Sequence, residues 1–182
     1  MQISVVVATK NEDSEYDELY KQAQKLAIKH LKLLSWGIDP TYPSKEEISK
    51  LSKEDFYLDN LNGYAGTFVG LRVDGVLVAG CKIKETYENV FHVPVFNTNT
   101  SYQKQGHGRR LFGFLVTMID GTNYKYFSLN PTQTSLSFWQ KMGMRKAEAR
   151  DGSVTFYWPV TPQQGQLVNS KMVIKSLHKQ TK

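Results

Sequence analysis

Residues 92–112 read HVPVFNTNTSYQKQGHGRRLF and place the end of a strand, a glycine pair and the start of an apolar helix in direct succession. Val90 to Thr98 is rich in β-branched and aromatic residues, and Arg109 to Ile119 carries apolar residues at helical spacing. Gly106 and Gly108 lack a Cβ, so the backbone between these elements can turn tightly and approach a ligand closely. The pattern predicts an anion-binding strand–loop–helix unit, and an ordinary turn into a helix is the alternative.

Immediately upstream, the sequence predicts a β-hairpin. Thr67 to Val73 and Val76 to Lys84 are β-rich runs that only Asp74 and Gly75 separate. A type I′ turn needs positive φ at both central positions, and Asp-Gly is among the pairs that adopt it most readily. We therefore expect an antiparallel pair of strands here.

The rest of the chain supplies the other elements of an α/β fold with a mixed sheet. We expect a strand at 3–8, an amphipathic helix at 16–34, a short helix starting at Ser44, a strand at 124–129, a helix at 132–142, and strands at 144–149 and 154–160. The predicted order is β-α-α-β-β-β-α-β-α-β-β. We expect one domain over residues 1–160, followed by a basic C-terminal appendage at 161–182.

The composition is that of a single globular domain. The chain has 182 residues, of which 40% are hydrophobic and 22% are charged. Its one cysteine, Cys81, excludes an internal disulfide framework and lies in a strand-like run, so we interpret it as a core residue. The start resembles no signal peptide and no stretch approaches the length of a membrane span, so we expect an intracellular protein, cytoplasmic or nuclear, without a membrane partner.

The positive charge lies with the glycine pair and the tail. The formal net charge is +6, residues 61–160 carry 11 Lys and Arg against 6 Asp and Glu, and residues 161–182 carry 4 Lys and no acidic residue. This excess suits an anionic ligand, a nucleic acid or a solvated surface, and the charge pattern leaves all three open.

The glycine loop fits neither of two common phosphate-binding patterns. It has no Gly-Lys-Ser/Thr of a P-loop and no third glycine with a following acidic residue, as a dinucleotide fold requires. Instead, the stretch from Gln103 to Gly108 (QKQGHG) resembles the Gln/Arg-x-x-Gly-x-Gly/Ala signature of the GNAT N-acetyltransferase superfamily. Residues 138–144, FWQKMGM, stand where that family often has a Phe-Tyr-x-x-x-Gly-Phe ending. The resemblance covers about residues 1–160 and is greatest to the branch of histone acetyltransferases and plant PHD-finger acetyltransferase domains.

The resemblance implies an enzyme that transfers an acetyl group from acetyl-CoA to a primary amine by direct attack in a ternary complex. It also implies a GNAT-type fold in which backbone groups of one strand hold the pantetheine and a backbone N–H polarises the thioester carbonyl. Pro94 suits a strand whose ladder is already broken. The implied pantetheine-binding residues are Phe96, Asn97 and Thr98, the implied pyrophosphate-binding residues are Gln103, Lys104, Gln105, Gly106, His107, Gly108 and Arg109, and no metal ligand is assigned.

Two positions depart from the family pattern. His92 stands fourteen residues before the first signature glycine, where the histone-acetyltransferase branch has a glutamate base, and its ordinary pKa near 6.5 suits a general base. Strand alternation predicts that His92 shares a face with Pro94 and Phe96. A packed strand histidine, or another base, is the alternative. Trp139 stands where many family members have a tyrosine acid, and an indole cannot donate that proton.

The basic side chains of His107 and Arg110 lie close to the signature glycines in the sequence. We expect His107 to face solvent or cofactor, and Arg110 either to add charge near the cofactor or to be solvated. A protein lysine, a small amine or a nucleic-acid amine all suit as acceptor. The alternatives to an active enzyme are a catalytically inactive GNAT-fold module that binds acyl-CoA or a macromolecular partner, and a nucleic-acid-binding or nucleic-acid-modifying protein.

Overall fold

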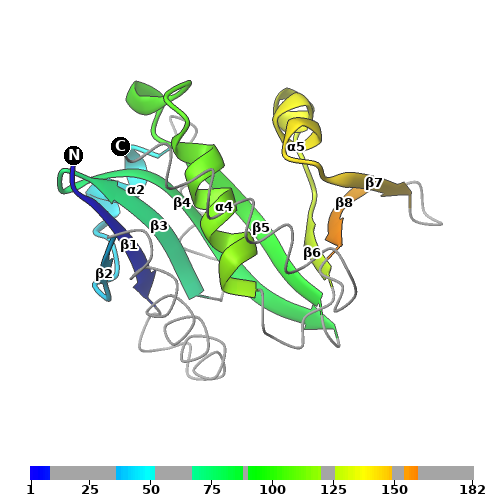
Figure 1. The fold of residues 1–182 in the computed structure, drawn as a ribbon, viewed down its shortest axis with the longest axis horizontal. Helices are drawn as coiled ribbons and strands as arrows, with labels where there is room; N and C mark the ends of the chain where they lie inside the picture. Colours follow the sequence, from blue (N-terminus) through cyan, green and yellow to red (C-terminus); the bar gives the residue numbers. More distant parts are fainter. Residues whose placement is uncertain (9–35, 52–66, 88–89, 120–125, 149–153, 160–182) are drawn as a thin grey trace.

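The computed structural model describes residues 1–8, 36–51, 67–87, 90–119, 126–148 and 154–159, and their centre is one mixed sheet (Figure 1). Within these residues, eight strands lie in the order β2-β1-β3-β4-β5-β6-β8-β7. The pairs β1–β2 and β5–β6 are parallel, and the others are antiparallel. The strands are β1 (Ile3–Ala8), β2 (Gly37–Asp39), β3 (Thr67–Val73), β4 (Val76–Tyr87), β5 (Val90–Thr98), β6 (Tyr126–Leu129), β7 (Arg145–Glu148) and β8 (Val154–Pro159).

Along the chain, the described helices and 3-10 turns fall between these strands. They are α2 (Lys45–Ser49), the 3-10 turn η2 (Thr100–Tyr102), α4 (His107–Ile119), the 3-10 turn η3 (Gln133–Ser135) and α5 (Leu136–Lys141). The expected helix at 16–34 and the appendage at 161–182 lie outside the described residues. Within the described part of the chain, no helix is long and apolar enough to cross a membrane.

The predicted hairpin of β3 and β4 is confirmed. Val73 pairs with Val76, and the two residues between them both have positive φ, 48° at Asp74 and 82° at Gly75. This is the turn geometry that Asp-Gly favours. The Asp74 carboxylate also accepts a hydrogen bond of 2.7 Å from the N–H of Gln2, which fixes the turn against β1.

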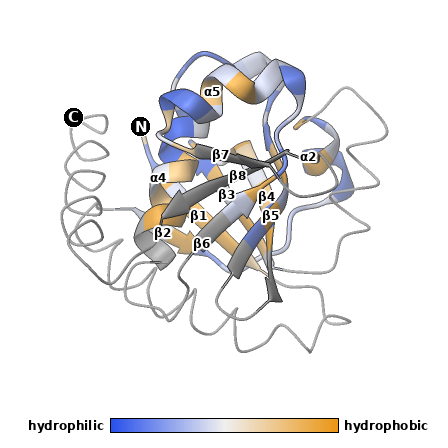
Figure 2. Cartoon of the chain, turned by 90° about the vertical axis from the view of Figure 1, so that its right-hand side faces the viewer, coloured by the Kyte–Doolittle hydropathy of each residue, from blue (hydrophilic) through white to orange (hydrophobic). Residues whose placement is uncertain are grey.

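Two hydrophobic clusters cover the two faces of the sheet. One packs α4 on the sheet, with Leu111, Phe114 and Leu115 against strand residues such as Cys81 and Ile83, and we call its side the α4 face. The other contains Ile48 and Leu51, at and just after α2, with Phe68 and Val95, and we call its side the α2 face. In Figure 2 the central strands are mostly hydrophobic, and hydrophilic segments lie toward the outside.

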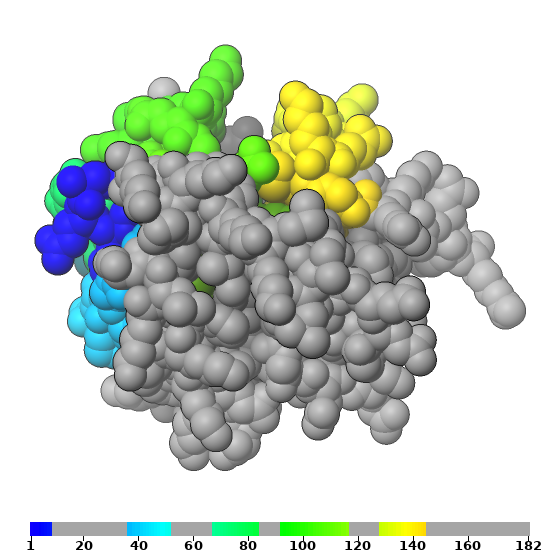
Figure 3. All heavy atoms as spheres, viewed as in Figure 1, coloured from blue at the N-terminus to red at the C-terminus, as the bar shows by residue number. Residues whose placement is uncertain are grey.

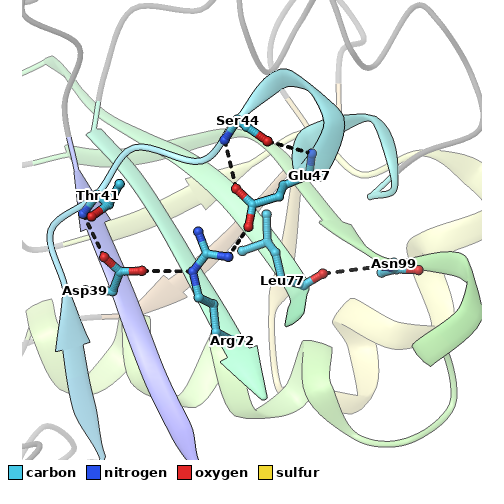
Figure 4. A network of polar contacts seen from close by, with 7 residues as sticks. All are labelled: Asp39, Thr41, Ser44, Glu47, Arg72, Leu77 and Asn99. Atoms are coloured by element: carbon cyan, nitrogen blue, oxygen red, sulfur yellow. Dashed lines mark hydrogen bonds and ion pairs between the residues drawn. The ribbon is translucent and has the colours of Figure 1, made fainter. Parts of the chain in front are cut away.

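A polar network holds α2 and β2 to the sheet (Figure 4). Arg72 on β3 donates to Asp39 of β2 over 2.9 Å and forms a second ion pair with Glu47 of α2. Glu47 also closes a capping box with Ser44, which explains why the helix begins there as predicted. The hydrogen bond from Arg72 lowers the pKa of Glu47. Burial raises the pKa of Asp39, but hydrogen bonds from Thr41 and Arg72 lower it overall.

Strand β2 was not expected from the sequence. No strand is predicted between the helix expected at 16–34 and the helix that starts at Ser44, yet Gly37–Asp39 pairs in parallel with β1. Three residues are too few to show an alternating pattern, and the strand is held by its neighbour and by the Asp39–Arg72 ion pair.

Candidate functional site

The sheet opens between β5 and β6. Among the described residues, the two parallel strands pair at three positions, Val90 with Tyr126, Phe91 with Phe127 and His92 with Ser128. Beyond His92, β5 continues to Thr98 with β4 on one side, and no described strand pairs with its other side. In Figure 1, β5 and β6 are close where both begin and diverge toward α5. The opening therefore leaves one backbone edge of Val93–Thr98 unpaired by any described strand.

A β-bulge lies at the start of this opening. Lys82 pairs with Val95 and Lys84 pairs with His92, so three steps along β5 match two steps along β4. The extra residue falls at Val93 and Pro94, which agrees with the expectation that Pro94 lies where the ladder is broken.

The bulge overturns the face predicted for His92. Val93 belongs to the cluster on the α4 face and Val95 to the cluster on the α2 face, whereas Phe96 packs on the α4 face. Because His92 precedes Val93 on a regular part of the strand, its side chain is on the α2 face, opposite to Phe96. The prediction from strand alternation is wrong because the extra residue of the bulge reverses the face on which each later side chain of β5 lies.

His92 is held at the narrow end of the opening by Ser128. Its Nδ1 lies 2.9 Å from the Ser128 hydroxyl oxygen. The histidine is partly buried and the serine is buried, and the two form the last pair of β5 and β6. Sequence reasoning missed Ser128, and its only signal was a lone hydroxyl in the otherwise aromatic and apolar run YFSL.

The open edge of β5 carries the backbone groups of Phe96 and Thr98. The N–H of Asn99 donates to the carbonyl of Val78 on β4 over 2.8 Å. Backbone groups alternate in direction along a strand, so those of Asn97 also face β4 and those of Phe96 and Thr98 face the opening. Of the three predicted pantetheine contacts, two therefore present main-chain donors and acceptors to the gap.

The glycine loop stands at the wide end of the opening. Residues 103–106 are exposed, and Lys104 and Gly106 have φ of 62° and 83°. The carbonyl of Gly106 accepts the first α4 hydrogen bond, from Arg110 over 3.0 Å, so the N–H groups of residues 107–109 are in the first helical turn. A Cβ on Gly106 would meet nothing within 4 Å. These amides, with exposed Lys104 and Arg109 beside them, are the donors of a helix N-terminus that suits an anion.

Gly108 brings α4 against β5 and α5. A Cβ at this position would lie 3.2 Å from Oγ1 of Thr98 and 3.5 Å from the ring of Phe138. The small residue therefore lets the start of α4 approach the end of the open edge. In the space-filling view, the segment before α4 (green) and the segment around α5 (yellow) rise as two prominences with a notch between them (Figure 3).

Two basic residues of α4 are more buried than expected. His107 is 5% exposed, so the solvent alternative of its expectation is wrong and the cofactor alternative stays a prediction. Arg110 is 9% exposed, so its solvated alternative is also wrong, and its NH1 lies 3.2 Å from Nδ1 of His107. Burial, followed by the charge of Arg110, lowers the pKa of His107.

Trp139 is a packing residue. It is 4% exposed and its ring lies 4.9 Å from that of Phe96, 4.8 Å from Phe138 and 5.9 Å from Phe112, centroid to centroid. This aromatic cluster joins α5 to β5 and α4 on the far side of the opening. Cys81 is fully buried and burial raises its pKa strongly, which confirms it as a core residue and not a nucleophile.

The geometry thus places three parts of the predicted site along the opening between β5 and β6. His92 is at the narrow end, the edge groups of Phe96 and Thr98 follow, and the turn with Gly106 and the start of α4 with Gly108 are at the wide end. A strand edge without a partner followed by a helix N-terminus can hold an elongated ligand that ends in an anionic group.

Comparisons with known proteins agree with this arrangement. The sequence model of the "Acetyltransferase (GNAT) family" matches residues 19–144. A search of curated protein sequences finds no match.

Several solved structures have a similar fold. A Bacillus subtilis acetyltransferase in complex with CoA is 16% identical, with a TM-score of 0.56 over 66% of this chain and 95% of that one. A GNAT family acetyltransferase from Elizabethkingia anophelis with acetyl-CoA bound is 12% identical, with a TM-score of 0.52 over 66% and 92%. A putative N-acetyltransferase from Lactobacillus plantarum is 12% identical, with a TM-score of 0.52 over 88% and 100%.

Proposed function

Because the chain belongs to the GNAT acetyltransferase family, we propose that it transfers the acetyl group of acetyl-CoA to a primary amine by direct attack in a ternary complex. The observation that carries the proposal is the opening between β5 and β6 with the N-terminus of α4 at its wide end. The acceptor is a protein lysine, a small amine or a nucleic-acid amine, and the branch of histone and PHD-finger acetyltransferases is the one that the sequence resembles.

In this proposal the cofactor lies along the open edge of β5. The N–H groups at the start of α4 and the loop from Gln103 to Arg109 receive the pyrophosphate, and the charges of Lys104 and Arg109 support it. The backbone groups of Phe96 and Thr98 bind the pantetheine, and the N–H of Phe96 polarises the thioester carbonyl. A main-chain donor suits this role because it is fixed before the reaction begins.

His92 is the proposed general base. The amine nitrogen attacks the thioester carbon, the carbon–sulfur bond breaks, and CoA leaves as a thiolate while the proton of the attacking nitrogen passes to the imidazole. Ser128 supports this role because it orients the ring at the narrow end of the opening. His92 is on the α2 face, so the acceptor approaches from the side opposite α4. Trp139 donates no proton to the thiolate, which leaves without an acid from that position.

Calorimetry with acetyl-CoA tests the proposed pyrophosphate site at the start of α4, which we call the cradle. Gly106→Asp places a negative side chain beside the amides, and we expect wild type to bind at micromolar affinity and the variant not to bind. Gly75→Asp is a matched control, because both glycines have nearly equal positive φ, 83° and 82°, with open space at the Cβ position. If Gly75→Asp loses binding equally, backbone strain explains the loss and the cradle is refuted.

An acceptor screen tests the chemistry. His92→Ala is expected to lower kcat by about 100-fold or more, the low end of general base catalysis, with acetyl-CoA affinity unchanged. The buried, packed position of Trp139 favours a second candidate, an inactive module that binds acyl-CoA without turnover. That candidate predicts binding with no acetylated product from amines, peptides or nucleic acids. Salt-sensitive nucleic-acid binding that CoA does not displace would support the third alternative instead.

A further inference from the structure

The loop before α4 needs an anchor that the glycines do not provide. Residues 103–106 are exposed, and Lys104 adopts φ of 62°, a conformation that costs a residue with a Cβ about 1 kcal/mol or more. A loop with such backbone angles keeps one shape only when its two ends are held. It forms part of the prominence beside α5 in Figure 3.

His107 contacts both ends of this loop. Its ring lies 6.1 Å from the ring of Tyr102, centroid to centroid, with an interplanar angle of 60°. Tyr102 is the last residue of η2 and immediately precedes the loop. On the other side, Nδ1 of His107 lies 3.2 Å from NH1 of Arg110, one helical turn further along α4. We call Tyr102, His107 and Arg110 the His107 clasp.

The chemistry of the pair fixes the state of the imidazole. A guanidinium is always a donor, so Nδ1 of His107 must be the unprotonated acceptor and the ring proton must be on Nε2. The burial of His107 and the positive charge of Arg110 both disfavour a second proton. The titratable side chains in contact with His107 in the described part of the chain are Arg110 on α4 and Tyr102 on η2.

We infer that the His107 clasp sets the direction of the N–H groups of residues 107–109 toward the cofactor pyrophosphate, with His107 as a positioning residue that uses its neutral side chain. The inference rests on the proposed function. His107 is the first residue of α4, so its side chain is attached to the same helical turn that carries these amides.

Three chains measured side by side test the clasp. His107→Phe keeps an aromatic ring against Tyr102 and removes the acceptor, whereas His107→Asn places an amide oxygen near the position of Nδ1. We expect His107→Phe to weaken acetyl-CoA binding about tenfold, the scale of one lost charge-assisted hydrogen bond, and His107→Asn to restore most of it. We expect the KM of acetyl-CoA to rise by a larger factor than kcat falls, because the clasp holds the cofactor site and touches neither reacting atom.

The pH profile separates positioning from a purely structural role. In wild type, acetyl-CoA affinity relative to His107→Asn should fall as the pH drops through the folded pKa of His107, which burial and Arg110 hold below the ordinary 6.5, because an imidazolium cannot accept from Arg110 and repels it. The ratio of the two proteins cancels the titration of the cofactor phosphates. Nitrogen NMR should find the ring proton on Nε2 at pH 7.

The outcomes are distinguishable. Equal affinity of wild type and His107→Phe at every pH overturns the clasp and leaves the proposed function intact. Equal loss in the Phe and Asn variants together with a lowered melting temperature also overturns it, because His107 then only stabilises the fold. Wild type that binds no acetyl-CoA overturns the proposed function and the clasp with it.

Discussion

His92 and Ser128 form the last pair of residues between β5 and β6, and their side chains meet there at 2.9 Å, Nδ1 to Oγ. The sheet separates immediately beyond this pair. A polar contact at the point of separation holds the imidazole beside the gap, on the face opposite α4. The orientation of the proposed base therefore depends on a residue of the neighbouring strand.

Ser128→Ala should lower kcat without weakening acetyl-CoA binding. The substitution removes the hydroxyl that holds Nδ1 and leaves the backbone pairing, so we expect a loss of about tenfold, the scale of one hydrogen bond. Steady-state kinetics with the acceptor found in the screen measures it. Ser101→Ala, at an exposed serine of η2, is the control. Equal kcat in Ser128→Ala and wild type would show that the serine does not orient the base.

Loss of the side-chain amide should affect the stability of the fold differently at Asn97 and at Asn99. Nδ2 of Asn97 is shielded from solvent and has no hydrogen-bond partner among the residues that the structure describes, whereas Asn99 accepts from the N–H of Ser101 over 3.0 Å and donates to the carbonyl of Leu77. Asn97→Leu should leave the free energy of unfolding unchanged or raise it, and Asn99→Leu should lower it by about 1 kcal/mol or more. Urea unfolding of both variants measures the difference. A clear loss in Asn97→Leu contradicts the assignment of its amide as unsatisfied.

The stability supplied by Arg72 should disappear in acid. The pKa of Glu47 is lowered in the folded state from its ordinary 4.5, and that of Asp39 from 3.8, so their contribution is complete above about pH 5 and is lost as the pH falls through the lower folded values. Arg72→Met should lower the free energy of unfolding by about 1 to 2 kcal/mol at pH 7, since these groups are partly exposed, and by much less near pH 2.

Urea unfolding of Arg72→Met at both pH values provides this test. Arg109→Met, at an exposed position of α4, serves as the control for loss of one positive charge. A difference between wild type and Arg72→Met that does not change with pH would show that the carboxylates are not its source.

Gly80→Ala should destabilise the fold. A Cβ at this position would lie 2.6 Å from the ring of Phe68 and 2.9 Å from a methyl group of Leu51, both of them fully or almost fully buried. Overpacking of this kind costs about 1 to 3 kcal/mol. A thermal melt measures it, with Gly37→Ala as the control, because a Cβ there has its nearest contact at 3.5 Å. Equal melting temperatures would show that the α2 face tolerates the added methyl group.

The sequence predicted elements whose signals are local. Asp74-Gly75 specifies a turn through its own backbone preferences, and Ser44 with Glu47 specifies a helix start through a capping box, so both are found where expected. Gly106 and Gly108 likewise act through the absence of a side chain. Their neighbours in space were not needed for the prediction.

The misses depend on contacts between distant segments. The face of the sheet predicted for His92 is wrong because a bulge against β4 adds one residue to β5. The prediction assumed an unbroken period of two along the strand. His107 is buried because Tyr102 and Arg110 pack against it, which no motif at that position indicates. Ser128 is paired with His92 only because β6 lies parallel to β5.

The open edge of β5 also has a mechanical consequence. An unpaired strand edge in the middle of a sheet presents free backbone N–H and C=O groups, as an edge at the rim does. Proteins generally protect such edges from pairing with other chains. In the part of the chain that the structure describes, β6, β8 and β7 join the remainder of the sheet through three pairs, so a molecule that hydrogen-bonds to the open edge of Val93–Thr98 would take the place of a missing strand. A ligand bound there would connect the two parts of the sheet, β2 to β5 and β6 to β7. Because such a ligand binds the folded state, the melting temperature should rise with ligand concentration.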